Sequence, residues 1–403
     1  MAETSSDTQN HVASTEPPDG SLVLKRMLLS VVIFLVMLKG VDLLLGWTWQ
    51  APVSHTVTRS IILRENPPNQ DTSMTANDQQ LREADSLARK TCRFRTDKDG
   101  FIIGPLDVAS TSTASREVDL LFLGGSTTEC RYVDEENRFP YRVSQLLQNA
   151  SGQNLRTLNG GVPGNHSMHS LLNCLSKGLA CKPRHVVLMH AVNDLGMLSR
   201  TGSYWEAPPG RRLIQEAALE AESGAVKRMA KLGKDLLFPN LWKFGRRGAP
   251  DPVDAGVEVD EWQAFRDVRR SPEEVEKILR EHFKPSLVSF VQVARAWKTE
   301  PILMTQFNRL HEEDKLVGSA YEARSQPMSY ADFRKLYQTA NEIVREVAAE
   351  TQTLLIDLDK QVPGDSRHLY DAVHLNDEGS RAVAEIIGQE LVRLKPGEFR
   401  GVK

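Results

Sequence analysis

The chain has 403 residues, of which 40% are hydrophobic and 26% charged, so it can bury the core of one large domain or two small ones. Its formal net charge of -3 argues against nucleic acid as the main partner, because proteins that bind nucleic acid usually carry a marked basic excess. Four cysteines are too few for a disulfide scaffold and lack the paired spacing of a zinc site. Cys174 and Cys181 could still form a disulfide in an oxidising compartment.

An apolar run at residues 27–48 follows a polar segment rich in Ser, Thr, Asp, Glu and Pro. The run is long enough to cross a bilayer as a helix that rises about 1.5 Å per residue. Lys39 and Asp42 interrupt it, but their spacing places them on one helical face, where they can pair. The alternative is a cleaved signal peptide, but no clear small-residue cleavage site follows. The pattern therefore favours a transmembrane anchor at 27–48 after a tail at 1–26.

Basic residues predict the orientation of this anchor. Lys25 and Arg26 precede the apolar run, whereas Arg59 alone is basic in the segment that directly follows it. Because Lys and Arg are enriched on the cytoplasmic side, we expect a cytoplasmic tail and a catalytic domain outside the cytoplasm, in the periplasm or at the cell surface. Residues 49–90 are polar, which predicts a linker or stalk with a short helix near 78–90.

From residue 91 to residue 396, apolar segments alternate with helical patterns. Strands are predicted at 118–123, 155–159, 185–190, 301–305 and 353–357. Helices are predicted at 139–150, 167–178, 273–298, 329–350 and 377–394. This alternation is typical of an α/β fold with a doubly wound, five-stranded parallel sheet and right-handed crossovers.

Residues 201–272 break this rhythm, which predicts an insertion between the third and fourth strands. Within it, residues 226–247 mix Lys and Arg with Leu, Phe and Trp. Such a basic amphipathic stretch could lie on a lipid surface or close over a site, or it could be a helix with a solvated basic face.

The strand at 118–123 ends abruptly in Gly124, Gly125 and Ser126. Its nearly unbroken apolar character is typical of a strand covered on both faces. A serine at its carboxyl end would lie where open α/β sheets bind their ligands. The alternative is an ordinary turn in which Ser126 only caps the next helix.

Chemically versatile residues follow other strands at the same predicted edge of the sheet. They are Gly161, Gly164 and Asn165 after the second strand, His190, Asn193 and Asp194 after the third, and Asp371 with His374 before the last helix. Each group alone is weak evidence, because glycine-rich and Asn-Asp segments are usually turns. Their order along one α/β pattern makes the prediction more specific.

That order resembles the SGNH (GDSL-type) hydrolase family, and in particular a subgroup with a Gly-Gly-Ser-Thr-Thr first block. The resemblance covers roughly residues 92–394. It implies a flavodoxin-like SGNH fold with Ser126 as the nucleophile, Asp371 and His374 as the rest of the triad, and Ser126, Gly164 and Asn193 as oxyanion-hole donors.

Many members of the family have Asp directly before the serine, where this chain has Gly125. Gly161 is a second candidate for the glycine of the second block, and we expect it to contact substrate together with Asn165, His190 and Asp194. Two of these have structural alternatives. His190 could pack in the core or at the rim, and Asp194 could accept hydrogen bonds from neighbouring loops.

The chemistry of the residues agrees with this assignment. A serine hydroxyl needs a base to take its proton, and an imidazole with a pKa near 6.5 can do so at neutral pH. Asp371, three residues before His374, can fix the imidazole tautomer and stabilise the imidazolium. The oxyanion of a tetrahedral intermediate then needs preorganised N–H donors, each of which typically contributes about 3 kcal/mol.

We therefore expect a membrane-anchored serine esterase that acts on acyl esters, with O-acetyl groups on a carbohydrate as the expected substrate. The glycan is inferred by analogy with single-anchor relatives, and a lipid ester is the other option. The sequence leaves two alternatives open, an O-acyltransferase for an envelope glycan and a catalytically silent glycan-binding or assembly protein. No metal, organic cofactor or nucleic acid partner is expected.

Overall fold

The computed structural model describes residues 21, 24–34, 36–37, 57–105, 118–151, 155–218, 262–324 and 326–399. The chain divides into two units. One comprises Met1–Thr58 and Ala217–Trp242, and the other comprises Arg59–Glu216 and Lys243–Lys403. The second unit holds the five-stranded sheet and all the residues discussed as a site.

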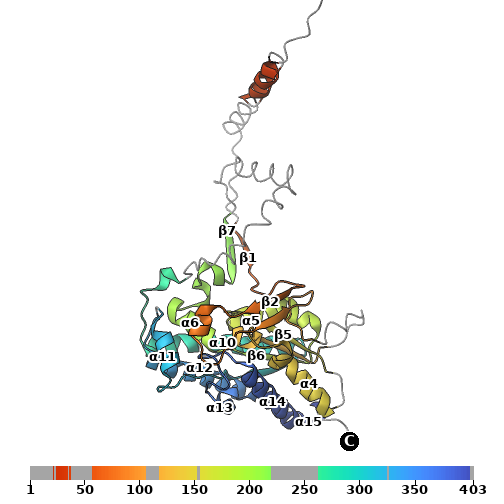
Figure 1. The fold of residues 1–403 in the computed structure, drawn as a ribbon, viewed down its shortest axis with the longest axis vertical. Helices are drawn as coiled ribbons and strands as arrows, with labels where there is room; N and C mark the ends of the chain where they lie inside the picture. Colours follow the sequence, from red (N-terminus) through yellow and green to blue (C-terminus); the bar gives the residue numbers. More distant parts are fainter. Residues whose placement is uncertain are drawn as a thin grey trace, which may run out of the picture. The chain divides into compact units, whose positions relative to one another are not determined.

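A parallel sheet of five strands with the order β5-β4-β6-β8-β9 forms the centre of the second unit (Figure 1). The strands are β4 (Leu120–Gly124), β5 (Thr157–Gly161), β6 (His185–Met189), β8 (Glu300–Met304) and β9 (Leu354–Ile356). The chain runs from β4 to one edge and then crosses to β6 on the other side of β4. This reversal creates a ligand crevice at the carboxyl end of β4, and it confirms the predicted α/β fold.

Side chains alternate along β4 between two buried cores. Leu121 and Leu123 belong to one core, and Leu120 and Phe122 belong to the other. A strand with helices on both faces must be apolar on both, which explains the unbroken apolar sequence of β4.

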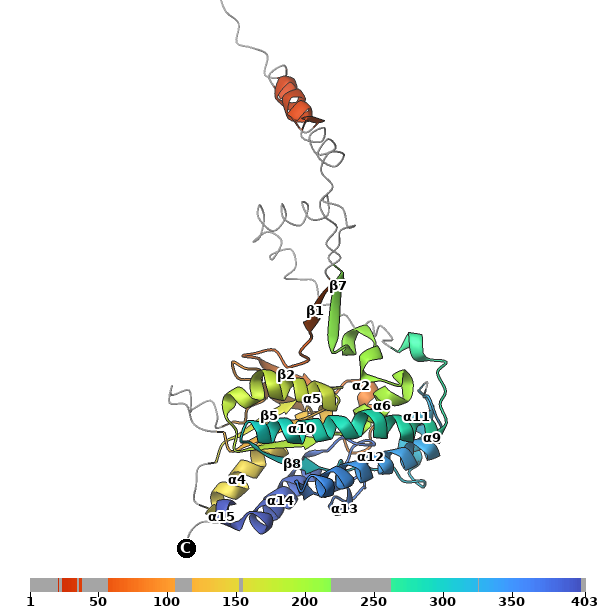
Figure 2. The same cartoon turned by 180° about the vertical axis from the view of Figure 1, so that it is seen from behind.

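Helices cover the two faces of the sheet separately. On the first face, α10 (Lys284–Ala296) contacts α5 (Ser167–Asn173) and α12 (Tyr330–Glu350), as Figure 2 shows. On the second face, α4 (Phe139–Ser151) packs against α14 (Asp377–Leu394).

The other α-helices of the sheet-containing unit whose bounds the structure describes are short. They are α2 (Asp78–Arg82), α3 (Ser126–Glu129), α6 (Val192–Thr201), α9 (Pro272–Ile278), α11 (Lys315–Glu322), α13 (Leu358–Gln361) and α15 (Pro396–Phe399). Two π-helical turns, Cys174–Gly178 and Leu279–Phe283, extend α5 and join α9 to α10, so the predicted helices at 167–178 and 273–298 are each made of several parts.

About three quarters of the predicted linker at 49–90 belongs to the unit with the sheet, which begins at Arg59. Here β2 (Asp71–Thr75) pairs antiparallel with β3 (Thr91–Arg95), and Asp85 accepts two hydrogen bonds of 2.7 and 2.6 Å from Arg309. The segment is held mainly by hydrogen bonds and ion pairs rather than by apolar side chains. A segment held in this way has a polar sequence, which is why the sequence predicted a linker here.

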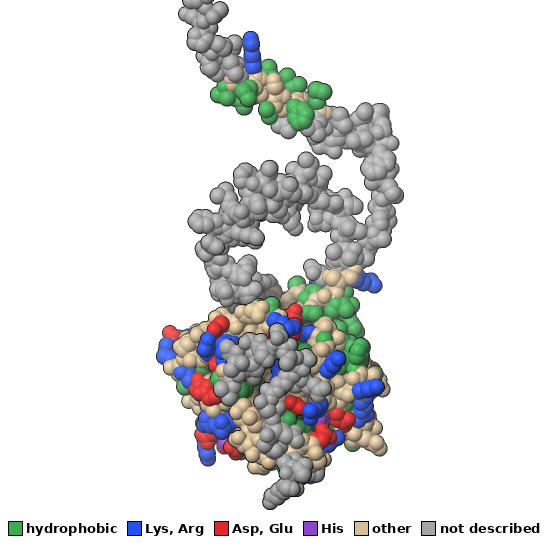
Figure 3. Space-filling view, turned by 90° about the vertical axis from the view of Figure 1, so that its right-hand side faces the viewer, with side chains coloured by type: hydrophobic (Ala, Val, Ile, Leu, Met, Phe, Trp, Pro, Cys, Tyr) green, Lys and Arg blue, Asp and Glu red, His purple; other side chains and the backbone are tan. Residues whose placement is uncertain are grey.

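Most of the predicted insertion at 201–272, including the basic stretch at 226–247, lies outside the described residues. Its first part ends in β7 (Ile214–Ala218), which pairs with β1 (Val57–Ile61) in a separate two-stranded sheet. The space-filling view shows hydrophobic side chains in green on the described surface next to this sheet (Figure 3), and Ile61 and Ile214 are 61% and 39% exposed.

In the part of the chain that the structure describes, we find no helix with the length and apolar character of a membrane span. Much of the predicted anchor at 27–48 and of the tail at 1–26 falls outside that part. Cys174 and Cys181 are both free thiols, so the disulfide considered from the sequence is not present.

We expect that a chain beginning at residue 91 is less stable than one beginning at residue 57. The shorter chain loses the Asp85 carboxylate and leaves the guanidinium of Arg309, a residue only 6% exposed, with one fewer partner. The loss should be about 1.5 to 3 kcal/mol, the usual contribution of a hydrogen bond to a charged group, because Asp314 remains as a partner of Arg309. Urea unfolding of both chains measures the difference, and equal midpoints and slopes would show that 57–90 is a linker.

Candidate active site

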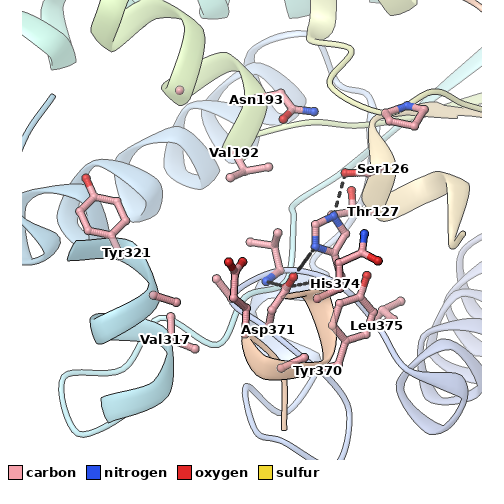
Figure 4. Close-up of a pocket in the computed structure, with 18 of the residues that line it drawn as sticks. Ser126, Thr127, Val192, Asn193, Val317, Tyr321, Tyr370, Asp371, His374 and Leu375 are labelled. Atoms are coloured by element: carbon pink, nitrogen blue, oxygen red, sulfur yellow. Dashed lines mark hydrogen bonds and ion pairs between the residues drawn. The ribbon is translucent and has the colours of Figure 1, made fainter. Parts of the chain in front are cut away.

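Ser126, His374 and Asp371 form a continuous hydrogen-bonded relay (Figure 4). The Ser126 hydroxyl donates to His374 Nε2 over 2.8 Å, and His374 Nδ1 lies 2.8 Å from Asp371 Oδ2 and 3.0 Å from Oδ1. A proton on Nδ1 leaves Nε2 free to accept the serine proton. The geometry therefore suits a serine nucleophile with a histidine base.

The loop before α14 fixes this base. Asp371 Oδ1 accepts the backbone N–H groups of Val373 and His374 at 2.9 and 2.8 Å, so the carboxylate is oriented by its own loop. The ring of Tyr370 stacks on the imidazole of His374, with ring centres 5.6 Å apart and an interplanar angle of 9°. The imidazole is thus held both in plane and from one face.

His374 and Asp371 shift each other's pKa because the imidazolium and the carboxylate attract each other. Burial works to lower the pKa of His374, but the charge and hydrogen bond of Asp371, followed by the charge of Glu129, outweigh it and raise the pKa above 6.5. Burial works to raise the pKa of Asp371, but His374 and the two backbone N–H groups outweigh it and lower the pKa. Asp371 is thus an anion that stabilises the imidazolium.

Of the three predicted oxyanion donors, Ser126 and Asn193 line the cavity at the triad, whereas Gly164 is not among its lining residues. Ser126 is the first residue of α3, so its backbone N–H is free of helical hydrogen bonds. Asn193 Nδ2 donates one hydrogen bond of 2.8 Å to the Asn165 carbonyl, which leaves its second N–H for a ligand. Gly164 has a φ of +70°, a conformation that favours glycine.

The position of Asn193 explains the glycine before the serine. A Cβ atom on Gly125 would lie 2.5 Å from Asn193 Nδ2 and 3.3 Å from the Asn165 carbonyl oxygen. An aspartate at this position, as in many members of the family that the sequence resembles, would therefore displace the amide. The departure noted in the sequence is thus a consequence of how closely α6 approaches the turn.

Two arginines that the sequence did not indicate hold the glycine-rich loop. Arg64 and Arg211 each donate to the carbonyl of Gly164 over 3.0 Å, and Arg64 also donates to the Pro163 carbonyl over 3.1 Å. The backbone oxygen of Arg64 in turn accepts from Asn165 Nδ2. These bonds orient the peptide units on either side of Gly164, a predicted oxyanion donor. No local motif could have revealed them, because the two arginines come from the predicted linker and insertion.

Gln306, after β8, joins two parts of the site. Its Nε2 donates to Thr127 Oγ1 over 2.7 Å, and its Oε1 accepts the backbone N–H of Val192 over 2.8 Å. The amide therefore ties the start of α3, which carries the nucleophile, to the start of α6, which carries Asn193. Its place after the fourth strand of a parallel sheet is the signal that could have identified it.

Four residues expected to contact substrate are buried instead. Gly161, Asn165, His190 and Asp194 do not line the cavity next to Ser126. Gly161 accepts a hydrogen bond of 2.9 Å from Asn66, and Asn165 positions Asn193. The reason is that the carboxyl ends of β5 and β6 are covered by the segment around Arg64 and by α5.

Asp194 and His190 take part in a buried polar cluster behind the site. Asp194 accepts from the Ser167 hydroxyl at 2.6 Å and from the Tyr204 hydroxyl at 2.5 Å, and His190 Nε2 lies 2.8 Å from the Ser170 hydroxyl. The structural alternative for both residues, raised from the sequence, agrees with these contacts.

Two further histidines lie in this cluster. His166 stacks against His169 and Tyr204, with ring centres 3.8 and 4.6 Å away. Burial first, then the neighbouring His169 and His190 and the charges of Arg64 and Arg211, lower the pKa of His166 well below 6.5. Burial likewise lowers the pKa of His169 to about 3. These imidazoles are neutral at pH 7. They differ in this from His374, whose pKa is raised rather than lowered.

A cavity of about 520 Å³ opens onto the triad. Ser126, Asn193, Asp371 and His374 line it, and its volume is in the range that holds a drug-sized ligand. Its wall also contains Glu129, whose side chain is only 1% exposed and accepts from Arg131 over 2.9 Å. Burial raises the pKa of Glu129 despite this arginine. Among the described residues, no cluster of three or more His, Cys, Asp or Glu could hold a metal ion.

Comparison with known proteins agrees with this geometry. Residues 122–382 match the GDSL-like Lipase/Acylhydrolase family. A search of curated proteins found no match.

Solved structures with a similar chain path include LAE5, an alpha/beta hydrolase enzyme from the metagenome of Lake Arreo in Spain. It is 15% identical, with coverage of 68% of this chain and 96% of LAE5 and a TM-score of 0.38. Axe2, an acetylxylan esterase from Geobacillus stearothermophilus, is 18% identical, with coverage of 68% of this chain and 94% of Axe2 and a TM-score of 0.38.

Gly125→Ala should disable the oxyanion hole without removing a catalytic group. The added methyl carbon would stand only 2.5 Å from Asn193 Nδ2 and would therefore displace the amide. We expect kcat for a small ester to fall about 100-fold or more, the usual effect of losing one donor. Gly318→Ala, where a Cβ meets only the Tyr330 ring at 3.5 Å, is the control. Wild-type kcat in Gly125→Ala would refute this role of Asn193.

The rate of ester hydrolysis should rise with pH through a midpoint above 6.5. His374 must be neutral to accept a proton, and its partner Asp371 raises its pKa. Asp371→Asn removes that charge, so the midpoint should move to lower pH while kcat falls about 1,000-fold or more. Profiles of kcat/KM against pH for both proteins test this. A wild-type midpoint below 6.5, or an unshifted midpoint in Asp371→Asn, would contradict it.

The buried histidines should make the fold labile in acid. Below pH 6.5 the unfolded chain binds protons that folded His166 and His169 do not, because their folded pKa values are depressed. The free energy of unfolding should therefore fall as the pH drops from 7 towards 4, by up to about 1.4 kcal/mol per pH unit for each histidine. His166→Phe should flatten this slope, and Ser144→Ala, which removes no titratable group, should not. Urea unfolding at several pH values measures the slopes, and equal slopes in all three proteins would exclude His166 as a source.

Proposed function

Since the chain belongs to the GDSL-like lipase/acylhydrolase family and is a serine ester hydrolase, we propose that it hydrolyses O-acyl esters of a carbohydrate by a two-step acyl-enzyme route. The observation that carries the proposal is the relay from Ser126 through His374 to Asp371, which opens onto a cavity of about 520 Å³.

In the first step, Ser126 Oγ attacks the acyl carbon while its proton passes to His374 Nε2. The negative charge that forms on the acyl oxygen is stabilised by the N–H groups of Ser126, Gly164 and Asn193, and Asp371 stabilises the imidazolium. The intermediate expels the alcohol, which takes its proton from His374. In the second step, His374 takes a proton from a water molecule that attacks the acyl carbon. The bond from the acyl carbon to Ser126 Oγ then breaks, His374 returns the proton to Ser126 Oγ, and the acid is released.

The polar part of the cavity wall supports a carbohydrate as the alcohol. Gln80 and Glu83, Arg131 and Tyr132 line it, and the Tyr132 hydroxyl donates to Gln80 over 2.9 Å. A sugar carries several hydroxyl groups that need such donors and acceptors, because a buried polar group without a partner is costly. O-acetyl is the acyl group expected from the sequence.

We also retain the membrane anchor and the location outside the cytoplasm as proposals. The apolar run at 27–48 supports them, and so do the large apolar side chains of the described helical residues 24–34, most of which are more than half exposed, such as Phe34 at 63%. We expect detergent, but not carbonate, to extract the chain from membranes. We also expect protease added outside intact cells to cleave it. Release into the soluble fraction by carbonate would refute the anchor.

Ser126→Ala tests the function directly. Wild-type protein should react with a fluorophosphonate probe and hydrolyse p-nitrophenyl esters, and the variant should do neither. Ser144→Ala is the matched control, because this buried serine on α4 donates to the Tyr141 carbonyl and does not line the cavity. A wild-type protein without labelling or hydrolysis would favour a silent binding protein. Acyl transfer to an added sugar in preference to water would favour the acyltransferase.

A further inference from the structure

One part of the active-site cavity is lined mainly by apolar side chains, with Arg200, Gln326 and Arg324 as its polar neighbours. We call it the apolar branch, and it is formed by Val192 and Gly196 of α6, Val317, Ala320 and Tyr321 of α11, and Phe333 of α12. It differs from the polar wall around Gln80 and Tyr132. One cavity therefore offers two environments to the two halves of an ester.

Gly196 is an unexpected residue for its place. It lies in the interior of α6 (Val192–Thr201), where glycine is less favourable than any other residue except proline. A Cβ on Gly196 would meet only Arg200 Nη1, at 3.9 Å, which is an ordinary contact. No atom of the described chain therefore requires a glycine here. What the glycine preserves is open space in the cavity wall.

The apolar branch begins next to the reacting atoms. Val192 and Asn193 are adjacent in α6, and Gly196 lies about one turn further along the helix. In Figure 4, Val192 lies to one side of Ser126, Tyr321 and Val317 lie beyond it, and His374 lies below the serine. The leaving alcohol must be near His374 Nε2 to take its proton. If the alcohol lies towards His374, the other half of the ester, the acyl substituent, lies towards Val192 and can extend past it.

The far part of the branch is rigid and of limited length. The Tyr321 hydroxyl donates to the Met328 carbonyl over 3.1 Å, and its ring packs against Phe333 with centres 4.9 Å apart. Arg200 lies at the end of α6, where it donates to the Gly196 carbonyl over 3.0 Å and to Gln326 Oε1 over 2.8 Å. The charged guanidinium of Arg200 marks the end of the branch, because a longer apolar chain would have to pack against it. The branch therefore suits a chain of medium length.

We infer that the apolar branch binds the acyl group of the ester and selects a straight, apolar chain of about four to eight carbons, the length that one to two helical turns of about 5.4 Å can flank. The inference rests on the proposed function. It replaces the O-acetyl group expected from the sequence, because a two-carbon acyl group would leave the branch beside Gly196 empty.

The first test is a series of p-nitrophenyl esters with the full chain. Because each buried methylene is worth about a fourfold gain, kcat/KM should rise at least about tenfold from acetate to hexanoate. A wild-type enzyme that prefers acetate would overturn the inference and leave the proposed function intact. A wild-type enzyme that hydrolyses no ester in the series would refute the proposed function itself.

The second test fills the branch. Gly196→Leu places a side chain in the open space, so the ratio of kcat/KM for hexanoate to that for acetate should fall to about one. Gly318→Ala on α11 does not alter the cavity wall and should keep the wild-type ratio. Thermal unfolding controls for folding, because replacing a helix-interior glycine should not lower the melting temperature. An unchanged ratio in folded Gly196→Leu would overturn the inference.

The third test separates the two halves of the ester. Ethyl, butyl and hexyl acetate vary the alcohol and keep the acyl group constant. Gly196→Leu should affect these three esters equally. If it instead abolishes a preference for hexyl acetate, the branch binds the alcohol and the inference is wrong.

Discussion

The site depends on the close approach of α3 to the ends of its neighbouring strands. A Cβ on Gly161, at the end of β5, would lie 2.3 Å from the backbone nitrogen of Glu129 in α3, and one on Gly125 would lie 2.5 Å from Asn193 Nδ2. Only glycine lets the backbone pack this closely. The approach turns Ser126 out of the sheet and towards His374, 2.8 Å away. The relay and the proposed oxyanion hole both follow from it.

Polar contacts from distant parts of the chain then hold this arrangement. Gln306 joins α3 to α6, and Arg64 and Arg211 converge on the Gly164 carbonyl. Electrostatic preorganisation of this kind is effective because the donors are already oriented before charge develops on the substrate. The segment from residue 59 to residue 90 is accordingly part of the catalytic unit, although its composition is that of a linker.

The same neighbourhood keeps imidazoles in two different states. Asp371 and Glu129 raise the pKa of His374, so that it can hold a proton during the reaction, whereas burial among other histidines and arginines lowers the pKa of His166. The environment of each ring, not its residue type, decides which one is a base. Local environment also underlies the proposed division of the cavity. The polar wall around Gln80 is proposed to bind an alcohol with several hydroxyls, and the wall at Gly196 is proposed to bind an apolar acyl chain.

The sequence by itself determined the order of strands and helices, because an apolar run such as Leu120–Leu123 can be buried only in a sheet covered on both faces. It also indicated Ser126, Asn193, Asp371 and His374, since parallel strands deliver their carboxyl ends to one edge. The tertiary structure alone decided the rest. His190 and Asp194 follow the same edge rule but are buried, because α5 and the segment around Arg64 cover that part of the edge. Arg64, Arg211 and Gly196 act through contacts or open space between segments far apart in the chain, and no local pattern encodes such distances.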